Sequence, residues 1–277
     1  MRTPDNDHLR PIEIRVENLF RSFGDNHILR GIDLEVRRGE ILAIVGPSGC
    51  GKTVLVDHII GLLKPDKGRV FVANHDVPSA PLVELTALDH DQKDEIRKHW
   101  AVVFQRNALF SGTVYDNIAL WLREVGRLDD SQIQPIVHTA LDAVGLDYDA
   151  VAPKDRDDLS GGMAKRVAIA RALAMDPYVM FYDEPTTGLD PQHAAQVHTL
   201  IGATHGRPLD DGTVRTTMMI THDKDLLARI EPRVVMLSEG KVFFDGPYEQ
   251  FKESESELIR PYLALMPLLQ QRVPLHE

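Results

Sequence analysis

A glycine-rich octapeptide constrains the fold of this chain more than any other stretch of its sequence. The octapeptide is Gly46-Pro47-Ser48-Gly49-Cys50-Gly51-Lys52-Thr53, and it fits the pattern G-x-x-x-x-G-K-[ST] of a phosphate-binding loop. An apolar run over 41–45 precedes it and predicts a buried parallel strand, and residues 54–60 predict a helix. This strand–loop–helix context disfavours the alternative, a glycine-rich turn that fits the pattern by chance.

The loop predicts a nucleotide site with a divalent cation. Glycines let the backbone approach a phosphate and turn its N–H groups toward it, and the N-terminus of the following helix adds partial positive charge. We expect Lys52 to reach the β- and γ-phosphates of ATP and the Thr53 hydroxyl to ligate Mg²⁺. The helix N-terminus and Lys52 together predict a lowered pKa for the Cys50 thiol.

The composition restricts the class of protein. The 277 residues include 42 acidic and 31 basic side chains, a formal net charge of −11, so we expect no nucleic-acid partner. Cys50 is the single cysteine, which excludes an internal disulfide framework. No run of about 18 apolar residues occurs, and Met1–Pro11 lacks an apolar segment. We therefore expect neither a membrane span nor a signal peptide, and any membrane role would require a partner.

Before the loop, the sequence has the pattern of a small antiparallel sheet. Residues 12–19 and 28–36 show the apolar–polar period of half-buried strands. Phe20 and Phe23 lie on this sheet, and two interpretations of them stay open. Both side chains could belong to the core, or Phe23 could stack on an adenine ring.

A mostly helical segment over 105–171 interrupts the predicted α/β core. Near its end stands the sequence Leu159-Ser160-Gly161-Gly162-Met163, which precedes a helical run over 164–174. Ser160 and the two glycines predict either a simple helix cap or a second anion site made of backbone N–H groups.

Polar side chains follow two further predicted strands. Asp183 and Glu184 come after the buried strand over 178–182, and His222 comes after the strand over 217–220. Parallel α/β sheets bind ligands at the carboxyl ends of their strands. We expect Asp183 to hold Mg²⁺, directly or through water, and Glu184 to polarise a water for attack on the γ-phosphate. The alternatives are a solvated acidic strand end and a structural histidine.

Taken in order, these motifs resemble the nucleotide-binding subunit of ABC transporters over roughly residues 12–247. The motifs are the aromatic loop (Phe23), Walker A (46–53), the glutamine loop (Gln105), the signature (159–163), Walker B with its glutamate (179–184), a D-loop (188–190) and the switch histidine (His222). The resemblance implies an α/β fold: a P-loop NTPase with a RecA-like core, an antiparallel β-subdomain and a helical subdomain.

The resemblance also implies domain limits and a mechanism. The parts would be an ATPase domain over 1–249, with its RecA-like core over about 12–104 and 172–246 and its helical subdomain over about 105–171, and a C-terminal extension over 250–277. Two copies would close head to tail, so that Ser160, Gly161 and Gly162 of one copy contact the γ-phosphate of ATP on the other. Gln105 would take part in catalysis, ligate Mg²⁺ and link the nucleotide state to a membrane permease subunit. His222 would hold the transition-state phosphate.

Departures from the usual family pattern indicate a subtype. Met163 ends the signature where most members have glutamine, and Tyr182 precedes Asp183 where an aliphatic residue is usual. The sequences over 104–110 and 114–118 are similar to those of Mla/Mce lipid-transport ATPases. The similarity implies a phospholipid or other lipid cargo, an Mce-domain lipid-binding partner, and a peripheral location on the cytoplasmic face of the inner membrane. A transporter for another cargo, such as an amino acid, stays open, and so does a soluble ABC ATPase outside transport.

The last residues predict a helix outside this pattern. Leu258, Tyr262, Leu265 and Leu269 recur at helical spacing, and Pro267 should bend or end the helix. This apolar strip either packs on its own subunit or docks on a second copy and helps to hold the dimer together.

Overall fold

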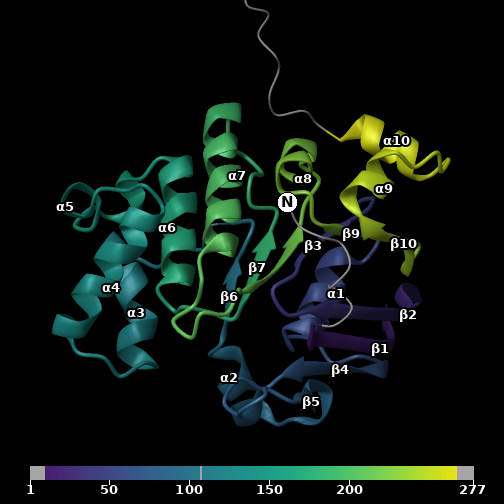
Figure 1. Ribbon diagram of the computed structural model, residues 1–277, viewed down its shortest axis with the longest axis horizontal. Coiled ribbons are helices and arrows are strands. Elements are labelled where there is room, and N and C mark those ends of the chain that lie inside the picture. Colours follow the sequence, from purple (N-terminus) through teal and green to yellow (C-terminus); the bar gives the residue numbers. More distant parts are fainter. Residues whose placement is uncertain (1–9, 107, 267–277) are drawn as a thin grey trace, which may run out of the picture.

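The computed structural model describes residues 10–106 and 108–266, which form two β-sheets and the helices around them (Figure 1). One sheet is antiparallel with the order β2-β1-β4-β5, and the other has the order β10-β9-β3-β8-β7-β6. In the second sheet only the β9–β10 pair is antiparallel. The strands are β1 (Ile12–Phe23), β2 (Asn26–Arg37), β3 (Ile41–Val45), β4 (Lys67–Ala73), β5 (Leu82–Glu84), β6 (Trp100–Val103), β7 (Val179–Asp183), β8 (Thr216–Ile220), β9 (Arg233–Ser238) and β10 (Lys241–Pro247).

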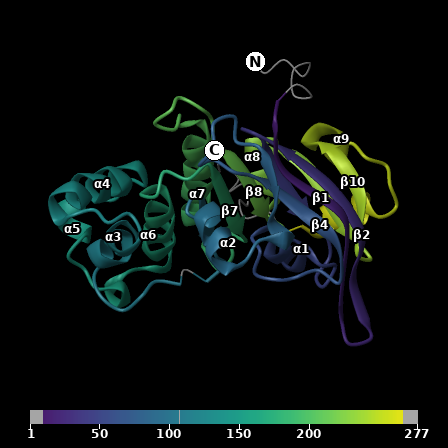
Figure 2. The same cartoon turned by 90° about the horizontal axis from the view of Figure 1, so that it is seen from below.

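Helices cover the second sheet and form a block beside it. They are α1 (Lys52–Ile59), α2 (His90–Arg97), α3 (Val114–Glu124), α4 (Asp130–Ala143), α5 (Tyr148–Val151), α6 (Gly161–Leu173), α7 (Pro191–Gly206), α8 (Lys224–Ile230), α9 (Tyr248–Lys252) and α10 (Ile259–Leu265), with 3-10 turns η2 (Leu85–Ala87) and η3 (Arg156–Asp158). Figure 2 shows the block α3–α6 on the side of the second sheet away from the antiparallel sheet. The predicted antiparallel sheet and helical segment are thus both present.

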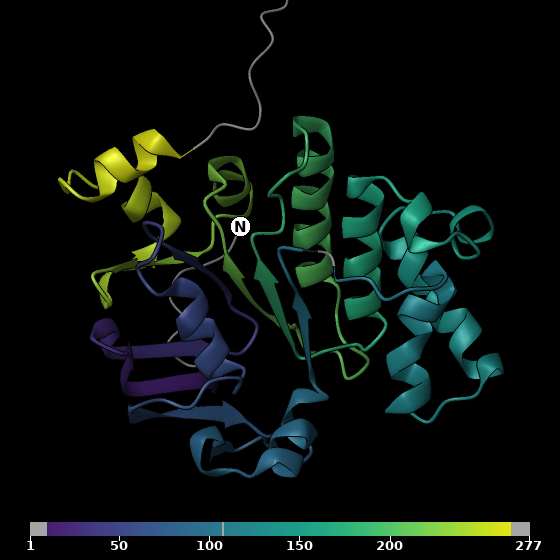
Figure 3. The same cartoon turned by 180° about the vertical axis from the view of Figure 1, so that it is seen from behind.

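Strand β3 alternates between two hydrophobic cores. Ile41, Ala43 and Val45 belong to a first core with the helical block, and Leu42 and Ile44 belong to a second. The second core lies between this sheet, α1 and the antiparallel sheet, and Figure 3 shows α1 in this position. Because both faces are covered, β3 is apolar throughout and its end is fixed in place. The phosphate loop begins at that end.

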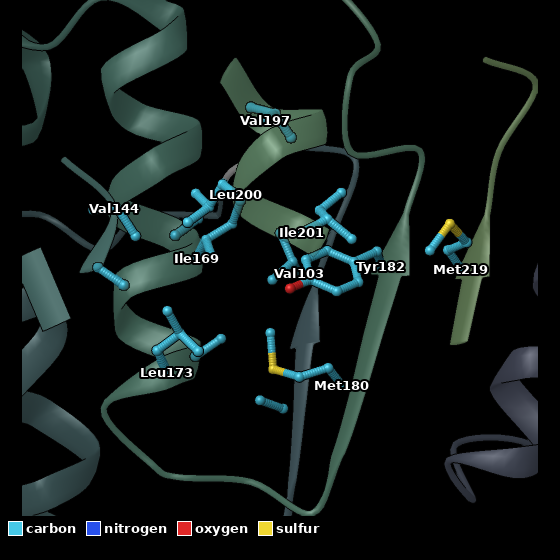
Figure 4. Close-up of a cluster of buried hydrophobic side chains, with 14 of the residues drawn as sticks. Val103, Val144, Ile169, Leu173, Met180, Tyr182, Val197, Leu200, Ile201 and Met219 are labelled. Carbon is cyan, nitrogen blue, oxygen red and sulfur yellow. The ribbon is translucent and has the colours of Figure 1, made fainter. Parts of the chain in front are cut away.

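The first core holds the helical block against the second sheet. Figure 4 shows side chains of α6 and α7 meeting those of β6, β7 and β8. Tyr182, the unusual residue before Asp183, is wholly buried there, and burial raises the pKa of its hydroxyl. Its ring therefore serves packing, not the chemistry of the strand end that follows it.

Helix α6 begins three residues before the predicted helical run and ends within one residue of its predicted end. It begins at Gly161 instead of Ala164, because the Ser160 hydroxyl accepts the N–H of Met163 (3.2 Å) and caps the first turn. It ends at Leu173, so the limit of the helical subdomain predicted after residue 171 falls inside a helix.

The C-terminal helices pack on the domain that precedes them. The domain limit predicted after residue 249 falls inside α9, and side chains within residues 250–266 pack in the first core. The buried side chains of this segment are Phe251, Ile259, Leu263 and Met266. Leu258 and Leu265, predicted on the packing strip, are instead exposed, Leu265 to 84%. The segment packs on its own subunit, but with a different face from the predicted one.

No helix within residues 10–106 and 108–266 is long and apolar enough to cross a bilayer. Helix α10 ends at Leu265 after seven residues. The predicted positions Pro267 and Leu269 lie outside the described residues.

Candidate nucleotide-binding and catalytic site

A cavity of about 650 Å³ lies where β3, β7 and β8 end. The predicted site residues that line it are Phe23, Gly46, Pro47, Ser48, Gly49, Gly51, Lys52, Thr53, Gln105, Asp183, Glu184 and His222. Cys50, Ser160, Gly161 and Gly162 do not line it. The fold therefore brings five separate stretches of the sequence to one place. Three of them follow β3, β7 and β8, as expected for the carboxyl edge of a parallel sheet.

The phosphate loop has a backbone that its glycines permit. Gly46 and Gly51 have φ angles of 143° and 101°. A Cβ atom on Gly46 would lie 2.3 Å from the carbonyl oxygen of Leu237, so any larger residue would displace the loop from β9. Lys52 Nζ donates to two carbonyl oxygens of the loop, 2.8 and 3.0 Å away. Its positive charge consequently lies over the loop, where an anion would bind.

Cys50 does not have the predicted low pKa. Its side chain is buried, and burial raises the pKa of the thiol above its ordinary value. Lys52 Nζ lies 4.0 Å from Sγ and acts in the opposite direction, but its effect is the smaller one. The prediction was wrong because it counted the nearby positive charge and not the loss of hydration.

Glu184 and His222 form a hydrogen-bonded pair. His222 Nδ1 lies 2.6 Å from Glu184 Oε2, and this bond raises the pKa of the imidazole against the opposing effect of burial. Glu184 has a φ of 48°, an unfavourable conformation for a residue with a side chain, and its N–H bonds the carbonyl of Ile220 (2.9 Å). A carboxylate held in this way against an imidazole can accept a proton and share it.

The donors around Asp183 fit a magnesium ion that arrives with a nucleotide. Thr53, Gln105 and Asp183 line the same cavity. Burial, and then the charges of Glu184 and Asp57, raise the pKa of Asp183, so a nearby cation would relieve an unfavourable concentration of negative charge. Among the described residues, no group of three or more His, Cys, Asp or Glu could hold a metal alone. Mg²⁺ commonly takes one or two carboxylates together with substrate phosphates and water, which this set allows.

Phe23 stands on the rim of the cavity. Its side chain is 46% exposed, so the interpretation as a core residue is wrong. The guanidinium carbon of Arg21 lies 4.6 Å from the centre of its ring. Stacking of the ring on an adenine stays a prediction.

The signature segment acts as a helix cap within its own chain. Ser160 caps α6, which confirms the first of the two interpretations of this sequence. Gly162 is buried, and a Cβ atom there would lie 2.4 Å from the ring of His193 at the start of α7. The segment packs with the first core, whereas α1 packs with the second, so Ser160 and Gly162 lie apart from the phosphate loop of the same chain. A role for them in binding an anion stays a prediction.

Sequence reasoning missed two side chains near the site. Lys165 on α6 is 1% exposed, and its Nζ donates to the carbonyls of Phe104 (3.1 Å) and Gln105 (2.9 Å). Burial lowers its pKa. The hydroxyl of Tyr262 on α10 accepts the N–H of Gly46 (3.0 Å), and burial raises its pKa to about 12. Lys165 stands in the helical run after the signature, and Tyr262 stands in the predicted C-terminal helix. Neither residue belongs to a motif, so nothing in the local sequence marked it as a site residue.

Comparison with known proteins identifies the family. The family description "ABC transporter" matches residues 29–187, more than half of the chain. The chain belongs to the ABC transporter family.

The ABC transporter ATPase has relatives along most of its length. It is 34% identical over 251 residues to the intermembrane phospholipid transport system ATP-binding protein MlaF of Haemophilus influenzae, covering 90% of this chain and 89% of that protein. It is 33% identical over 255 residues to the energy-coupling factor transporter ATP-binding protein EcfA2 of Clostridioides difficile, covering 89% and 83%. The dimeric ATP-binding cassette MJ0796, bound to ADP and Pi in a post-hydrolysis state, superposes with a TM-score of 0.71 and 28% identity, covering 85% of this chain and 98% of that one.

These findings confirm the predicted P-loop NTPase fold and the prediction that the ABC protein is an ATPase. It binds ATP and acts as the ATPase subunit of a transporter. The roles of individual side chains, the metal and the cargo are proposals.

Proposed function

We propose that this ATPase supplies the energy for moving phospholipids, or closely related lipids, across the cell envelope. The observation that carries the proposal is its similarity, over almost the full length of both chains, to the ATP-binding protein of an intermembrane phospholipid transport system. The Met163 ending of the signature and the sequence over 104–110 support the same subtype.

In the proposed reaction, the triphosphate of ATP lies on the phosphate loop. Loop N–H groups and Lys52 hold the phosphates. Thr53, Asp183 and Gln105 would hold Mg²⁺, and the ion would supply positive charge to the phosphate oxygens. Glu184 accepts the proton of the attacking water. The cavity supports this assignment, because all five of these side chains line it.

The switch histidine completes the proposed transition-state contacts. His222 bonds Glu184 through Nδ1, which leaves Nε2 on the other side of the ring to donate to the γ-phosphate. The bond to Glu184 raises the pKa of the imidazole and so favours its protonated form, and a cationic donor would stabilise the charge of the transition state. Phe23 on the rim stacks on the adenine.

A second copy of the chain completes each site in this proposal. Helix α6 is 13 residues long, and the N–H groups of its first turn, at Gly161 and Gly162, would bind the γ-phosphate of ATP held by the other copy. Ser160 joins them at the helix start. The arrangement requires a head-to-tail dimer with two ATP molecules between the copies.

We also propose a membrane permease as a partner, with an Mce-domain lipid-binding protein in the same complex. A groove of about 400 Å³ between α3, α6 and β6 is lined largely by apolar side chains, among them Phe110, Leu120, Trp121, Val125 and Met175. Phe110 and Val125 are more than half exposed. An amphipathic permease helix would bury them. The ATPase would then lie peripherally on the cytoplasmic face of the inner membrane.

Lipid transfer by the purified complex tests this function. The tagged full-length chain is isolated with its partners from detergent-solubilised membranes, reconstituted, and assayed for ATP-dependent transfer of labelled phospholipid between vesicles. A complex assembled with Glu184→Gln is the matched control. Transfer by the wild-type complex alone supports the proposal. A complex that hydrolyses ATP but moves no phospholipid overturns the lipid assignment and leaves the ATPase assignment intact.

A further inference from the structure

A buried carboxylate, Asp223, follows the switch histidine and is 2% exposed. Its Oδ1 accepts the backbone N–H groups of Asp225 and Leu226, both at 3.0 Å, and so caps α8. Its Oδ2 accepts from two side chains, His198 Nε2 at 2.6 Å and Thr186 Oγ1 at 2.8 Å. Because an ionised carboxylate only accepts hydrogen bonds, Nε2 of His198 carries a proton.

This cluster joins the two loops that carry the proposed catalytic pair. Thr186 lies two residues after Glu184, and Asp223 is the neighbour of His222 in sequence. The bond between Thr186 and Asp223 therefore connects one loop to the other. His198 extends the connection to α7, a third element of the fold.

Helix α7 is itself fixed relative to the signature. It packs against both α6 and α8. In its first turn, the ring of His193 lies against Gly162, so a larger residue at position 162 would have to displace that ring. His198, one and a half turns further along the same helix, thus connects the start of α6 to the loops beside the nucleotide cavity.

Asp223 depends on these hydrogen-bond donors because its carboxylate is buried. Burial acts to raise the pKa of Asp223, but the hydrogen bonds from His198, the Leu226 N–H and Thr186 outweigh it and hold the pKa below its ordinary range. A buried charge that loses a donor must move or become neutral. The position of His198 therefore decides where Asp223, and with it the loop of His222, can lie.

We propose that His198 is a positioning residue for ATP hydrolysis, which fixes the Glu184–His222 pair through Asp223 and Thr186. The proposal rests on the roles proposed above for Glu184 and His222. His198 does not line the nucleotide cavity, so its loss acts on the rate of hydrolysis and not on the binding of ATP.

Two substitutions at this position, with one control on the same helix, test the proposal in the full chain. His198→Phe keeps the bulk of the ring and removes the donor. His198→Gln restores an N–H near the position of Nε2. The control is His205→Phe, because His205 is equally buried in α7 but bonds the hydroxyl of Thr217 at the far end of β8 (3.1 Å). For each variant, kcat and KM for ATP are measured well below its melting temperature.

We expect kcat of His198→Phe to fall about 10- to 100-fold with KM for ATP within twofold of wild type. His198→Gln should recover kcat to within about threefold of wild type, and His205→Phe should keep it within twofold. Equal kcat in the two phenylalanine variants would overturn the proposal, and so would a glutamine variant no better than phenylalanine. If His198→Phe fails to fold, Thr186→Val and Thr186→Ser provide the same comparison at the other donor to Oδ2.

A parallel measurement separates this proposal from the one on which it rests. Glu184→Gln is assayed under the same conditions. If it keeps wild-type turnover, the assignment of the catalytic pair fails. If it loses turnover while His198→Phe does not, only the positioning role fails.

Discussion

Replacement of Lys165 by methionine separates the stability of the fold from the geometry of the glutamine loop. The ammonium group of Lys165 is buried, and its two carbonyl acceptors are Phe104 and Gln105, at the point where β6 gives way to the loop. Methionine has a similar length and no charge, so it keeps the packing of α6 and removes both hydrogen bonds.

The two effects on stability oppose each other. Each hydrogen bond from a charged donor contributes about 1.5–3 kcal/mol. Keeping an ammonium group out of water costs several kcal/mol, a cost that appears here as the lowered pKa of Lys165. The freed carbonyls belong to exposed residues and can bond water. We therefore expect the free energy of unfolding of Lys165→Met to lie within about 2 kcal/mol of wild type.

Activity should respond much more strongly than stability. Gln105 lines the nucleotide cavity, and the carbonyl of its own peptide group is the acceptor that Lys165 holds. A displacement of about 1 Å in a positioning residue can cost up to about 10²-fold in rate, so we expect kcat to fall at least about tenfold. If Gln105 ligates Mg²⁺, the half-saturating Mg²⁺ concentration should also rise.

Steady-state ATP hydrolysis and thermal unfolding of the same preparations check this expectation. The matched control is Arg166→Met, which removes a cation from the next position of α6, where the guanidinium bonds the carbonyl of Gly145 (3.3 Å) and not the glutamine loop. A kcat of Lys165→Met within twofold of wild type, or an equal loss in both variants, would refute the reasoning.

Four further predictions concern the site and the C-terminal helices. Glu184→Gln should bind ATP normally and lose about 10²- to 10⁴-fold in turnover, because an amide cannot accept the proton; hydrolysis within threefold of wild type would contradict its role. Maleimide should inhibit ATPase activity by labelling Cys50, which lies within the phosphate loop, and bound Mg-ATP should protect against it. Because burial raises the pKa of the thiol, the labelling rate should still increase with pH above about pH 8.5. A labelling rate that reaches its plateau at neutral pH would indicate a lowered pKa instead. In the assembled complex, Met163→Gln should keep substantial ATPase activity and Ser160→Arg should not; equal losses would contradict the proposed anion contact. Phe251→Ala should cost about 3–5 kcal/mol in urea unfolding, because the ring is completely buried; a loss below about 1 kcal/mol would show that α9 is dispensable.

The sequence predicted those site residues that stand directly after a strand. Asp183, Glu184 and His222 stand at the ends of apolar runs, and the ends of parallel strands meet at one edge of the sheet. The phosphate loop follows the same logic after β3. Local sequence was sufficient here, because each side chain is placed by the few residues before it.

The pKa of Cys50 shows what local sequence omits. Its neighbours Lys52 and the start of α1 favour the thiolate, but burial opposes it and has the larger effect. Burial depends on the second core, to which β1, β2, β3, β4 and α1 all contribute, so most of the residues around Cys50 in that core are distant from it in sequence. Lys165 and His198 escaped attention for the same reason, since their partners lie about sixty and twenty-five positions away.

Helix α10 shows that a correct period can still point to the wrong face. Leu258, Tyr262 and Leu265 have the same spacing as a second apolar stripe one residue further along, formed by Ile259, Leu263 and Met266. Periodicity cannot choose between two apolar stripes, because the choice depends on the surface that the helix meets. The second stripe fills the first core, and this orientation carries Tyr262 to the N–H of Gly46. The packing of Ile259, Leu263 and Met266 in the first core therefore also places Tyr262 at the wall of the nucleotide cavity. A substitution that loosens this packing should also weaken the hydrogen bond between the Tyr262 hydroxyl and the N–H of Gly46.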